Sequence, residues 1–384
     1  MKNIRTLIFI NHYLPGFKFG GPIRSIQAIV SKLFSNLDFS IITSDRDFGD
    51  TKPYASIQLN TWQKMNHSSI YYCHGNTLNF IKLIISECRK HDVVYLNSFF
   101  NLNFSILIIL LKYLGLVRSE IIIAPRGEFN PGALKIKNKK KRFYLNVTKF
   151  FGLYKNIRWH ATTEEEYNMI TDIFGNHAKV ILAEGMSPQV VNYDLVVNLK
   201  KQHSLRLVYL ARVAQIKNLI FILKLLERNN FQGEIVLDIY GPKEDIDYFK
   251  KCEEIIQIIN SKSNSICISY KGEVAYENVL STIAFYDFYI LPTLGENFGQ
   301  SIADALSVGV PVIISNKTPW TNLENKGVGW DLTLEEEPFV NVLKYCIQLN
   351  HDDYNNFQLA AVKYASEFLD NQLLKNKYLS LFQD

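Results

Sequence analysis

The chain of 384 residues is too long for one ordinary domain and about right for two. Hydrophobic residues make up 47% and charged residues 21%, which is typical of a globular protein with enough apolar material for two cores. The net charge of +5 is modest and no nucleic-acid-binding module is visible, so the composition disfavours a nucleic-acid-binding protein.

Three features bear on the compartment. The apolar start, 6–10, is too short for a signal peptide and predicts a first strand. The longest other apolar stretch, 106–117, is shorter than the ~20 residues that span a bilayer. The five scattered cysteines favour a reducing compartment. We therefore expect a cytoplasmic protein, with room for peripheral contact with the inner face of the cell membrane.

Short β-branched runs alternate with helical patterns along the first half of the chain, as in parallel sheets covered by helices. The expected strands are 4–10, 39–43, 69–72, 92–97, 121–124 and 179–182. The expected helices include 22–34, 78–90, 104–114 and 163–174.

The pattern restarts after a polar segment, 187–204, that contains Pro188. The expected strands are then 205–210, 235–240, 265–270, 288–291 and 312–314. The expected helices are 219–228, 245–259, 276–285 and 300–308, and the tail from about 335 is mostly helical.

Two such series predict an α/β protein with two Rossmann-like, doubly wound parallel sheets whose carboxyl edges face a central cleft. We expect a first domain at 1–186, a linker at 187–204 and a second domain at 205–365. A C-terminal helix at 366–384 is expected to pack back on the first domain.

Residues 291–315 carry the most informative pattern, a strand followed by a glycine-containing loop and a helix. Gly295 and Gly299 lie in this loop, and unpaired N–H groups at such a helix start attract phosphate. Glu296 and Asp304 form an acid pair separated by seven residues. Carboxylates beside a phosphate site are suited to accept hydrogen bonds from sugar hydroxyls.

Two further segments follow expected strands. Arg212 and Lys217 offer a bidentate fork and a point charge, a suitable pair for a departing diphosphate. The loop at 11–25 contains Gly20 and Gly21, and paired glycines let a backbone approach a ligand closely.

At these residues the chain resembles family 4 of the retaining glycosyltransferases, which have the GT-B fold. Glu296 to Asp304 resembles the family's E-x7-E motif, Arg212 and Lys217 match its Arg and Lys, and Gly20–Gly21 match its N-terminal loop. The segments 125–135, 160–166, 318–320 and 327–330 resemble members that build bacterial surface polysaccharides.

The resemblance implies transfer of a sugar from a UDP- or GDP-sugar to a glycan acceptor, lipid-linked, in O-antigen, capsule or exopolysaccharide synthesis. It implies that Arg212 and Lys217 hold the diphosphate, that Glu296 contacts the donor sugar and that Asp304 contacts the ribose. The other implied donor contacts are Gly20, Gly21, Gly241, Val274, Asn297, Phe298, Gly299 and Gln300. The nucleotide-sugar is a substrate, and neither a metal nor a cofactor is expected.

The sequence departs from the family pattern at two positions. Asp304 is one methylene shorter than the usual Glu, and Arg126 stands where many relatives carry a histidine. We expect Arg126, Glu128 and His12 to contact the acceptor, although a lone histidine such as His12 is often structural. His160 and Glu165 are expected to orient the chain around a strand end.

The run Lys135–Arg142 is the densest basic cluster, and Lys149, Lys155 and Arg158 extend it among interleaved aromatic residues. It fits either a solvated helix face or contact with anionic lipid headgroups or a lipid-diphosphate acceptor. The triplet 245–247 matches a D-x-D pattern, but it lies at an expected helix start, where such a match arises by chance.

Other classes of protein stay open beside the leading interpretation. A nucleotide-binding oxidoreductase is disfavoured because no G-x-G-x-x-G follows any expected strand. A non-catalytic GT-B scaffold or nucleotide-sugar-binding protein, a sugar phosphorylase and an epimerase are the remaining alternatives.

Overall fold

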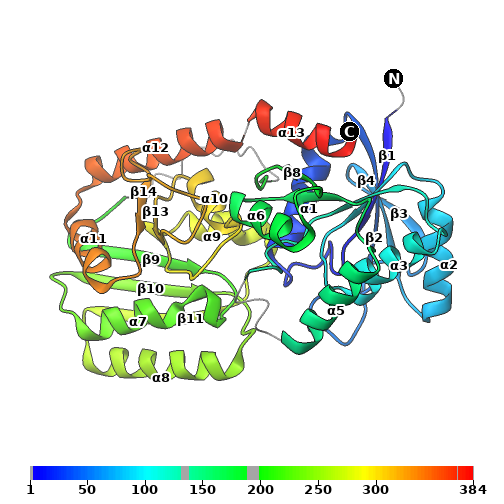
Figure 1. Cartoon of the computed structure of the whole chain (residues 1–384). Helices are drawn as coiled ribbons and strands as arrows, with labels where there is room; N and C mark the ends of the chain where they lie inside the picture. Colours follow the sequence, from blue (N-terminus) through cyan, green and yellow to red (C-terminus); the bar gives the residue numbers. More distant parts are fainter. Residues whose placement is uncertain (1–2, 131–137, 188–198, 370, 384) are drawn as a thin grey trace. The chain divides into compact units, whose positions relative to one another are not determined.

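The computed structural model describes residues 3–130, 138–187, 199–369 and 371–383. The chain forms two compact units, each built around one sheet (Figure 1). Unit 1 comprises Met1–Pro188 and Asn371–Asp384, and unit 2 comprises Gln189–Asp370. Most of the expected linker, 188–198, lies outside the described residues.

Unit 1 contains an eight-stranded sheet in the order β3-β4-β2-β1-β5-β6-β7-β8. Neighbouring strands are parallel except at one edge, where β3 pairs with β4 in the antiparallel direction. The strands are β1 (Ile4–Phe9), β2 (Leu37–Ser44), β3 (Trp62–Met65), β4 (Ser68–Cys73), β5 (Val93–Leu96), β6 (Glu120–Ile123), β7 (Arg158–Ala161) and β8 (Lys179–Leu182).

Apolar clusters cover both faces of this sheet. Along β1, Ile8 belongs to one cluster while Leu7 and Phe9 belong to the other, because successive side chains of a strand point to opposite faces. This double burial explains why the strand is apolar at nearly every position. The helices of unit 1 are α1 (Gly21–Leu33), α2 (Thr77–Cys88), a π-helical turn (Leu102–Ile106) that leads into α3 (Leu107–Tyr113), α5 (Asn138–Phe150), α6 (Glu164–Phe174) and α13 (Gln372–Gln383).

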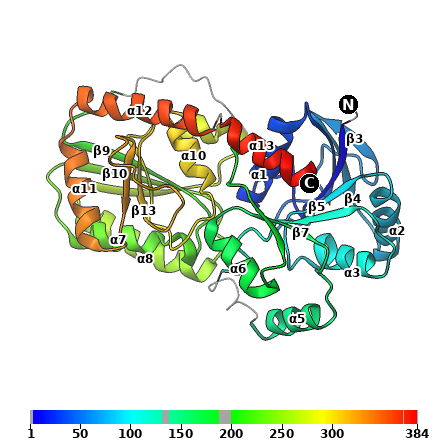
Figure 2. The same ribbon diagram turned by 45° about the horizontal axis from the view of Figure 1, so that its top comes forward.

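The last helix, α13, belongs to unit 1 although it follows unit 2 in the chain. It lies beside α1 in both views (Figures 1 and 2). Leu374, Tyr378, Leu381 and Phe382 are buried in the cluster on its face of the sheet. The C-terminal segment therefore completes the core that the N-terminal segment begins.

Unit 2 contains a six-stranded parallel sheet in the order β11-β10-β9-β12-β13-β14. Its strands are β9 (Ser204–Leu210), β10 (Glu234–Tyr240), β11 (Ile266–Gly272), β12 (Phe288–Leu291), β13 (Val312–Ser315) and β14 (Gly329–Leu332). Its helices are 3₁₀ turns at Gln215–Lys217 and Tyr276–Asn278, α7 (Leu219–Arg228), α8 (Ile246–Lys262), α9 (Val279–Ile283), α10 (Gln300–Ser307), α11 (Glu336–Gln348) and α12 (His351–Leu369). One apolar cluster spans the unit.

The sequence pattern does not predict β3, β7 or β14. β3 is a half-exposed edge strand whose residues include Gln63 and Lys64. β7 contains Arg158 and His160, and their polar groups are satisfied inside the unit, so the strand lacks an apolar run. These strands are therefore defined by pairing with their neighbours, which no short stretch of sequence reveals.

Candidate functional site

The sheet of unit 2 reverses its strand order between β9 and β12. In chain order the strands take the positions 3-2-1-4-5-6, the arrangement of a Rossmann fold. Ligands of such sheets bind beyond the carboxyl ends of the two strands at the reversal. Lys217 follows β9 and Glu296 follows β12, so the topology itself brings both residues to this point.

Backbone contacts hold the two segments together. Leu294 N donates to Ile216 O at 2.8 Å, and Thr293 Oγ1 donates to the same oxygen at 3.0 Å. Glu296 N donates to Lys317 O at 3.0 Å, which ties the loop to the end of β13. The loop that carries Glu296 is therefore fixed against the segment that carries Lys217.

Lys217 and Glu296 form an ion pair across this junction, although they lie 79 residues apart in the chain. Their side chains are 14% and 12% exposed, so the pair is largely shielded from solvent. A shielded cation and carboxylate that can exchange partners are the groups needed to receive a charged, hydroxyl-rich ligand.

Arg212 pairs instead with Glu244, which follows β10. These side chains are 40% and 33% exposed, so the pair contributes at most about 1 kcal/mol. Gly241 supports the arrangement, because a Cβ there would lie 2.0 Å from Ala211 O. The close approach of the backbone to the loop of Arg212 thus explains the glycine at 241. Val274 packs against the apolar core of unit 2.

The helix α10 begins directly after the loop that carries Glu296. Its N-cap is Gly299, with φ +78°, and no side chain caps the helix. Within the described residues, the side-chain nitrogen of Asn297 is buried and has no hydrogen-bond partner. Uncapped amides and an unsatisfied buried donor are the expected features of a site that receives an oxygen-rich ligand.

An aromatic group that the sequence roles leave out supports this loop. Trp320 Nε1 donates to Phe298 O, and the Trp320 ring packs on Phe368 of α12 at 4.6 Å between centroids. The motif 318–320 marks Trp320 in the sequence, but nothing in the spacing indicates that its partner is a carbonyl of the loop. Lys317 and Glu244 are likewise contacts that sequence reasoning misses.

Asp304 and the D-x-D triplet have different surroundings. Asp304 lies on α10 and is only 3% exposed. Asp245 caps α8 by accepting from Tyr248 N at 2.9 Å, which gives its carboxylate a structural role. Among the residues that the structure describes, no three His, Cys, Asp or Glu side chains are grouped so that they could hold a metal ion.

In unit 1, Arg126 lies at the carboxyl ends of β5 and β6 with φ +54°. Its Nε donates to Asn97 Oδ1 and its Nη2 donates to Tyr95 Oη, each at 2.9 Å. Tyr95 in turn donates to His160 Nδ1 at 2.7 Å, because His160 Nε2 donates to Ala183 O at 2.8 Å. The side-chain nitrogen of Asn97 is buried without a partner in the described part of the chain.

Burial, helped by the nearby Arg126 charge, lowers the pKa of His160 to about 3. His160 is therefore neutral at ordinary pH and acts as a fixed hydrogen-bonding bracket. This agrees with the expectation that it orients the chain.

The carboxylates near Arg126 are also engaged. Glu128 accepts from Ser98 Oγ, Phe99 N and Phe100 N at 2.6–2.9 Å. Burial raises the pKa of Glu128, and these hydrogen bonds offset part of the increase. The expectation for Glu165 is wrong: it is exposed, and Glu166 orients the chain by accepting from Gly127 N at 2.7 Å.

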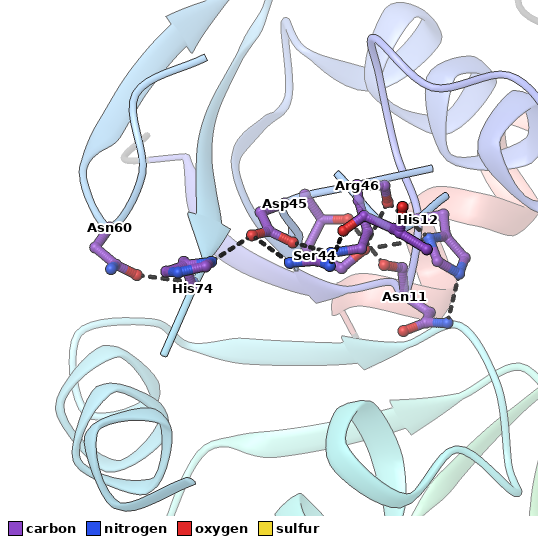
Figure 3. A network of polar contacts seen from close by, with 9 residues as sticks. Asn11, His12, Ser44, Asp45, Arg46, Asn60 and His74 are labelled. Atoms are coloured by element: carbon purple, nitrogen blue, oxygen red, sulfur yellow. Dashed lines mark hydrogen bonds and ion pairs between the residues drawn. The ribbon is translucent and has the colours of Figure 1, made fainter. Parts of the chain in front are cut away.

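His12 belongs to a polar network at the ends of β1, β2 and β4 (Figure 3). Its Nδ1 donates to Arg46 O at 2.9 Å, and its Nε2 accepts from Asn11 Nδ2 at 2.8 Å. Both ring nitrogens are thus in use, and an acceptor role for His12 stays a prediction. Gly20, the N-cap of α1, and Gly21 have open space where a Cβ would lie.

The basic run differs from its expected composition. Residues 135–137 lie outside the described residues, and the rest of the run lies on α5. Arg158 does not extend it, because its side chain is 10% exposed and pairs with Glu120. Tyr154 is buried and its hydroxyl bonds that of Tyr144, so these rings belong to the core. The exposed aromatic rings here are Phe143, Phe150 and Phe151.

The arrangement of two Rossmann-like units, each a parallel sheet covered by helices, defines the class: the chain has the GT-B fold. Residues 194–330 match the family model described as Glycosyl transferases group 1. The matched residues include Arg212, Lys217 and Glu296.

Solved structures that resemble the chain agree on the fold. The Anabaena protein HepE in complex with UDP and glucose has a TM-score of 0.67 and 12% identity, over 99% of this chain and 100% of that chain. A glycosyltransferase from Rickettsia africae ESF-5 has a TM-score of 0.68 and 15% identity, over 100% and 98%. The lipopolysaccharide outer core galactosyltransferase WaaB has a TM-score of 0.58 and 15% identity, over 98% of this chain and 99% of that chain. No curated protein sequence matches the chain.

Proposed function

We propose that this chain is a retaining glycosyltransferase that moves a sugar from a nucleotide-sugar to a glycan acceptor without a metal ion. The observation that carries the proposal is the Lys217–Glu296 pair beside the uncapped start of α10, at the strand reversal of unit 2. HepE, which shares the fold, is recorded with UDP and glucose, and this supports a nucleotide-sugar as donor.

In this proposal Lys217 and Arg212 exchange their carboxylate partners for the donor diphosphate. Glu296 is released to accept hydrogen bonds from the donor sugar, and the amides at 297–300 face the sugar and phosphates. Asp304 contacts the ribose, with the base near Gly241 and Val274 and the Gly20–Gly21 loop beside the phosphates. The cations and the start of α10 stabilise the charge that grows as the diphosphate leaves.

The bond between the anomeric carbon and the diphosphate oxygen breaks as the acceptor oxygen attaches to the same face of the sugar. The acceptor proton passes to the departing diphosphate oxygen, so no separate base is required. Positioning and charge stabilisation then account for the rate. On the acceptor side, the unsatisfied amide of Asn97 beside Arg126 supports a hydroxyl-bearing ligand at the edge of unit 1.

Lys217→Ala tests the donor site. Removal of one transition-state donor of this kind costs about 100- to 1,000-fold in kcat. We expect a loss of that size with a panel of UDP-, GDP- and ADP-sugars, and an unchanged circular dichroism spectrum. Lys224→Ala, which removes an exposed lysine of α7, is the matched control and should keep full activity. Near-normal turnover by Lys217→Ala removes the diphosphate assignment, and wild-type protein without turnover favours a binding scaffold.

The stereochemistry has its own measurement. Proton NMR of the product formed from an α-linked donor should show an α-glycoside as the first product. A β-glycoside would replace retention by inversion while leaving the donor assignment in place.

We further propose that the acceptor is lipid-linked, in surface-polysaccharide synthesis, and that α5 contacts the cytoplasmic face of the membrane. Lys139, Lys140 and Arg142 are exposed on this helix, as are Phe143 and Phe150, at 71% and 85%. Basic residues near an anionic surface contribute about 1 kcal/mol each, and the rings can enter the interface. None of the helices in the described ranges is both long and apolar enough to cross a bilayer.

Co-sedimentation with vesicles that contain anionic lipid tests this contact. Phe143→Ser with Phe150→Ser should reduce binding by at least about ten-fold, since each removes an exposed ring from the interface. Phe285→Ser, which changes an exposed ring in unit 2, should not. Vesicle binding that is unaffected by salt concentration and by the two α5 substitutions contradicts the proposal.

A further inference from the structure

Unit 1 contains a cavity of about 540 Å³, a volume within the range of small-molecule sites. It opens beyond the carboxyl ends of β1, β2 and β4, next to the network in Figure 3. All its lining residues lie between Asn11 and Phe104, so it belongs to unit 1 alone. None of the predicted acceptor contacts, His12, Arg126 and Glu128, lines it.

The wall of this cavity combines amide and hydroxyl side chains with aromatic rings. None of the described residues that line it carries a carboxylate, and Lys82 is the one lysine among them. The polar residues of the wall are Asn11, Ser44, Asn60, His74, Asn76, Thr77, Asn79 and Asn103. Tyr71, Phe80 and Phe104 supply the rings. An amide carries both donors and an acceptor, the combination that a sugar hydroxyl uses.

Part of the wall is fixed by hydrogen bonds within the protein. Asn60, at φ +57°, accepts from His74 N at 2.9 Å. His74 Nδ1 donates to Asp45 Oδ2 at 2.6 Å, and Asp45, 5% exposed, is also held by Arg46 at 2.7 Å. The His74 ring is therefore anchored through its Nδ1, and Figure 3 shows it lying between Asn60 and Asp45.

Another part of the wall has hydrogen-bonding capacity to spare. Four side chains of the wall make no hydrogen bond or ion pair in the part of the chain that the structure describes. They are those of Thr77, Asn79, Lys82 and Asn103. The cavity therefore combines an anchored frame with available donors and acceptors, which lowers the cost of ordering on binding.

Anions fit this wall less well than neutral ligands do. The start of α2 is capped by Asn76, whose Oδ1 accepts from Asn79 N at 3.0 Å, so that amide is not open to a phosphate. Within the ranges that the structure describes, Lys82 is the one lysine on the wall, and no arginine lines it. A phosphate ligand would normally be held by several charge-assisted bonds.

We propose that this cavity binds a short saccharide, with amides on its hydroxyls and Phe80 and Phe104 against its apolar face. The identification of this saccharide as the sugar chain of the acceptor rests on the proposed function. The binding itself stands on the wall of the cavity.

Saturation-transfer-difference NMR on the full chain tests the inference. The probes are methyl glycosides of the common hexoses, 6-deoxyhexoses and N-acetylhexosamines, at millimolar concentration. At least one should give a signal with wild type. Asn79→Ala with Asn103→Ala should weaken its affinity about ten-fold or more, because each lost hydrogen bond is worth about 1 kcal/mol. Asn146→Ala, an exposed asparagine of α5, is the matched control and should bind as wild type does.

The outcomes separate the cavity from the donor site. Lys217→Ala should keep saccharide binding while it loses turnover, so failure of donor chemistry leaves the cavity assignment standing. Wild-type protein that binds no glycoside of the panel overturns it, as does equal affinity in the double variant. Binding of inorganic phosphate that Lys82→Gln abolishes and that competes with the glycoside would assign the cavity to an anion instead.

Discussion

The carboxyl edges of the two sheets place their charges in different ways. In unit 2, cations pair with carboxylates from other loops, as Lys217 does with Glu296 and Arg212 does with Glu244. In unit 1, Arg126 is held by neutral partners, Tyr95 and Asn97, and the neighbouring His160 is kept neutral. The two edges therefore hold their cations in different ways: by ion pairs between loops in unit 2, and by hydrogen bonds to neutral side chains around Arg126 in unit 1.

The largest expected effect comes from breaking the shielded pair of unit 2. Glu296→Gln keeps the shape of the side chain but removes the charge that pairs with Lys217 and that, in the proposed donor site, accepts from the donor sugar. We expect kcat/KM for the nucleotide-sugar to fall by about 100-fold.

Glu244→Gln sharpens the same comparison, because Glu244 pairs with Arg212 and, in the proposed donor site, would compete with the diphosphate for it. Its donor KM should fall by up to about five-fold, the equivalent of the at most ~1 kcal/mol of an exposed pair. Equal losses in both variants would mean that the two pairs do not differ in role. Steady-state kinetics on each variant measures this.

A second test concerns the neutral network of unit 1. Because the pKa of His160 is about 3 in the folded state and near 6.5 when unfolded, the unfolded chain binds an extra proton between these values. Stability present above pH 6.5 is therefore lost as pH falls towards 3, by up to about 1.4 kcal/mol per pH unit. Urea unfolding of wild type and His160→Asn at a series of pH values should show the variant losing less over this range.

His177→Asn, an exposed histidine of the same unit, serves as the control and should follow wild type. If His160→Asn also follows wild type, the claim that burial keeps His160 neutral fails.

The last test concerns the hydrogen bond that supports the loop at 297–300. Trp320→Phe keeps a ring against Phe368 but leaves Phe298 O without its donor. The lost bond, worth about 1 kcal/mol, should raise the donor KM about five-fold with little change in kcat.

Trp330→Phe is the matched control, since Trp330 packs in the core against Phe357 at 5.2 Å between centroids. It should lower the melting temperature without changing the donor KM. A loop that depends equally on both tryptophans would be stabilised by general packing and not by the hydrogen bond.

The candidate residues of unit 2 are easier to recognise in the sequence than those of unit 1, for a physical reason. A parallel sheet buried on both faces produces apolar runs, and Lys217 and Glu296 stand out because they lie in glycine-containing or polar segments that follow the ends of those runs. Their mutual pairing depends on the contact between the Thr293 and Ile216 segments, which spacing does not reveal. Hydroxyl recognition imposes no fixed spacing, so Asn79 and Asn103 give no signal in the sequence. Polar strands such as β3 and β7 are hidden for a similar reason.

The place of α13 has a consequence for how the chain comes into being. Since Leu374, Tyr378 and Leu381 complete the core on one face of the unit 1 sheet, that core is still open when residue 188 has been synthesised. Unit 2 is continuous in the chain, so it can fold before its predecessor is finished. During translation, unit 1 therefore keeps part of its apolar surface uncovered until α13 has been synthesised.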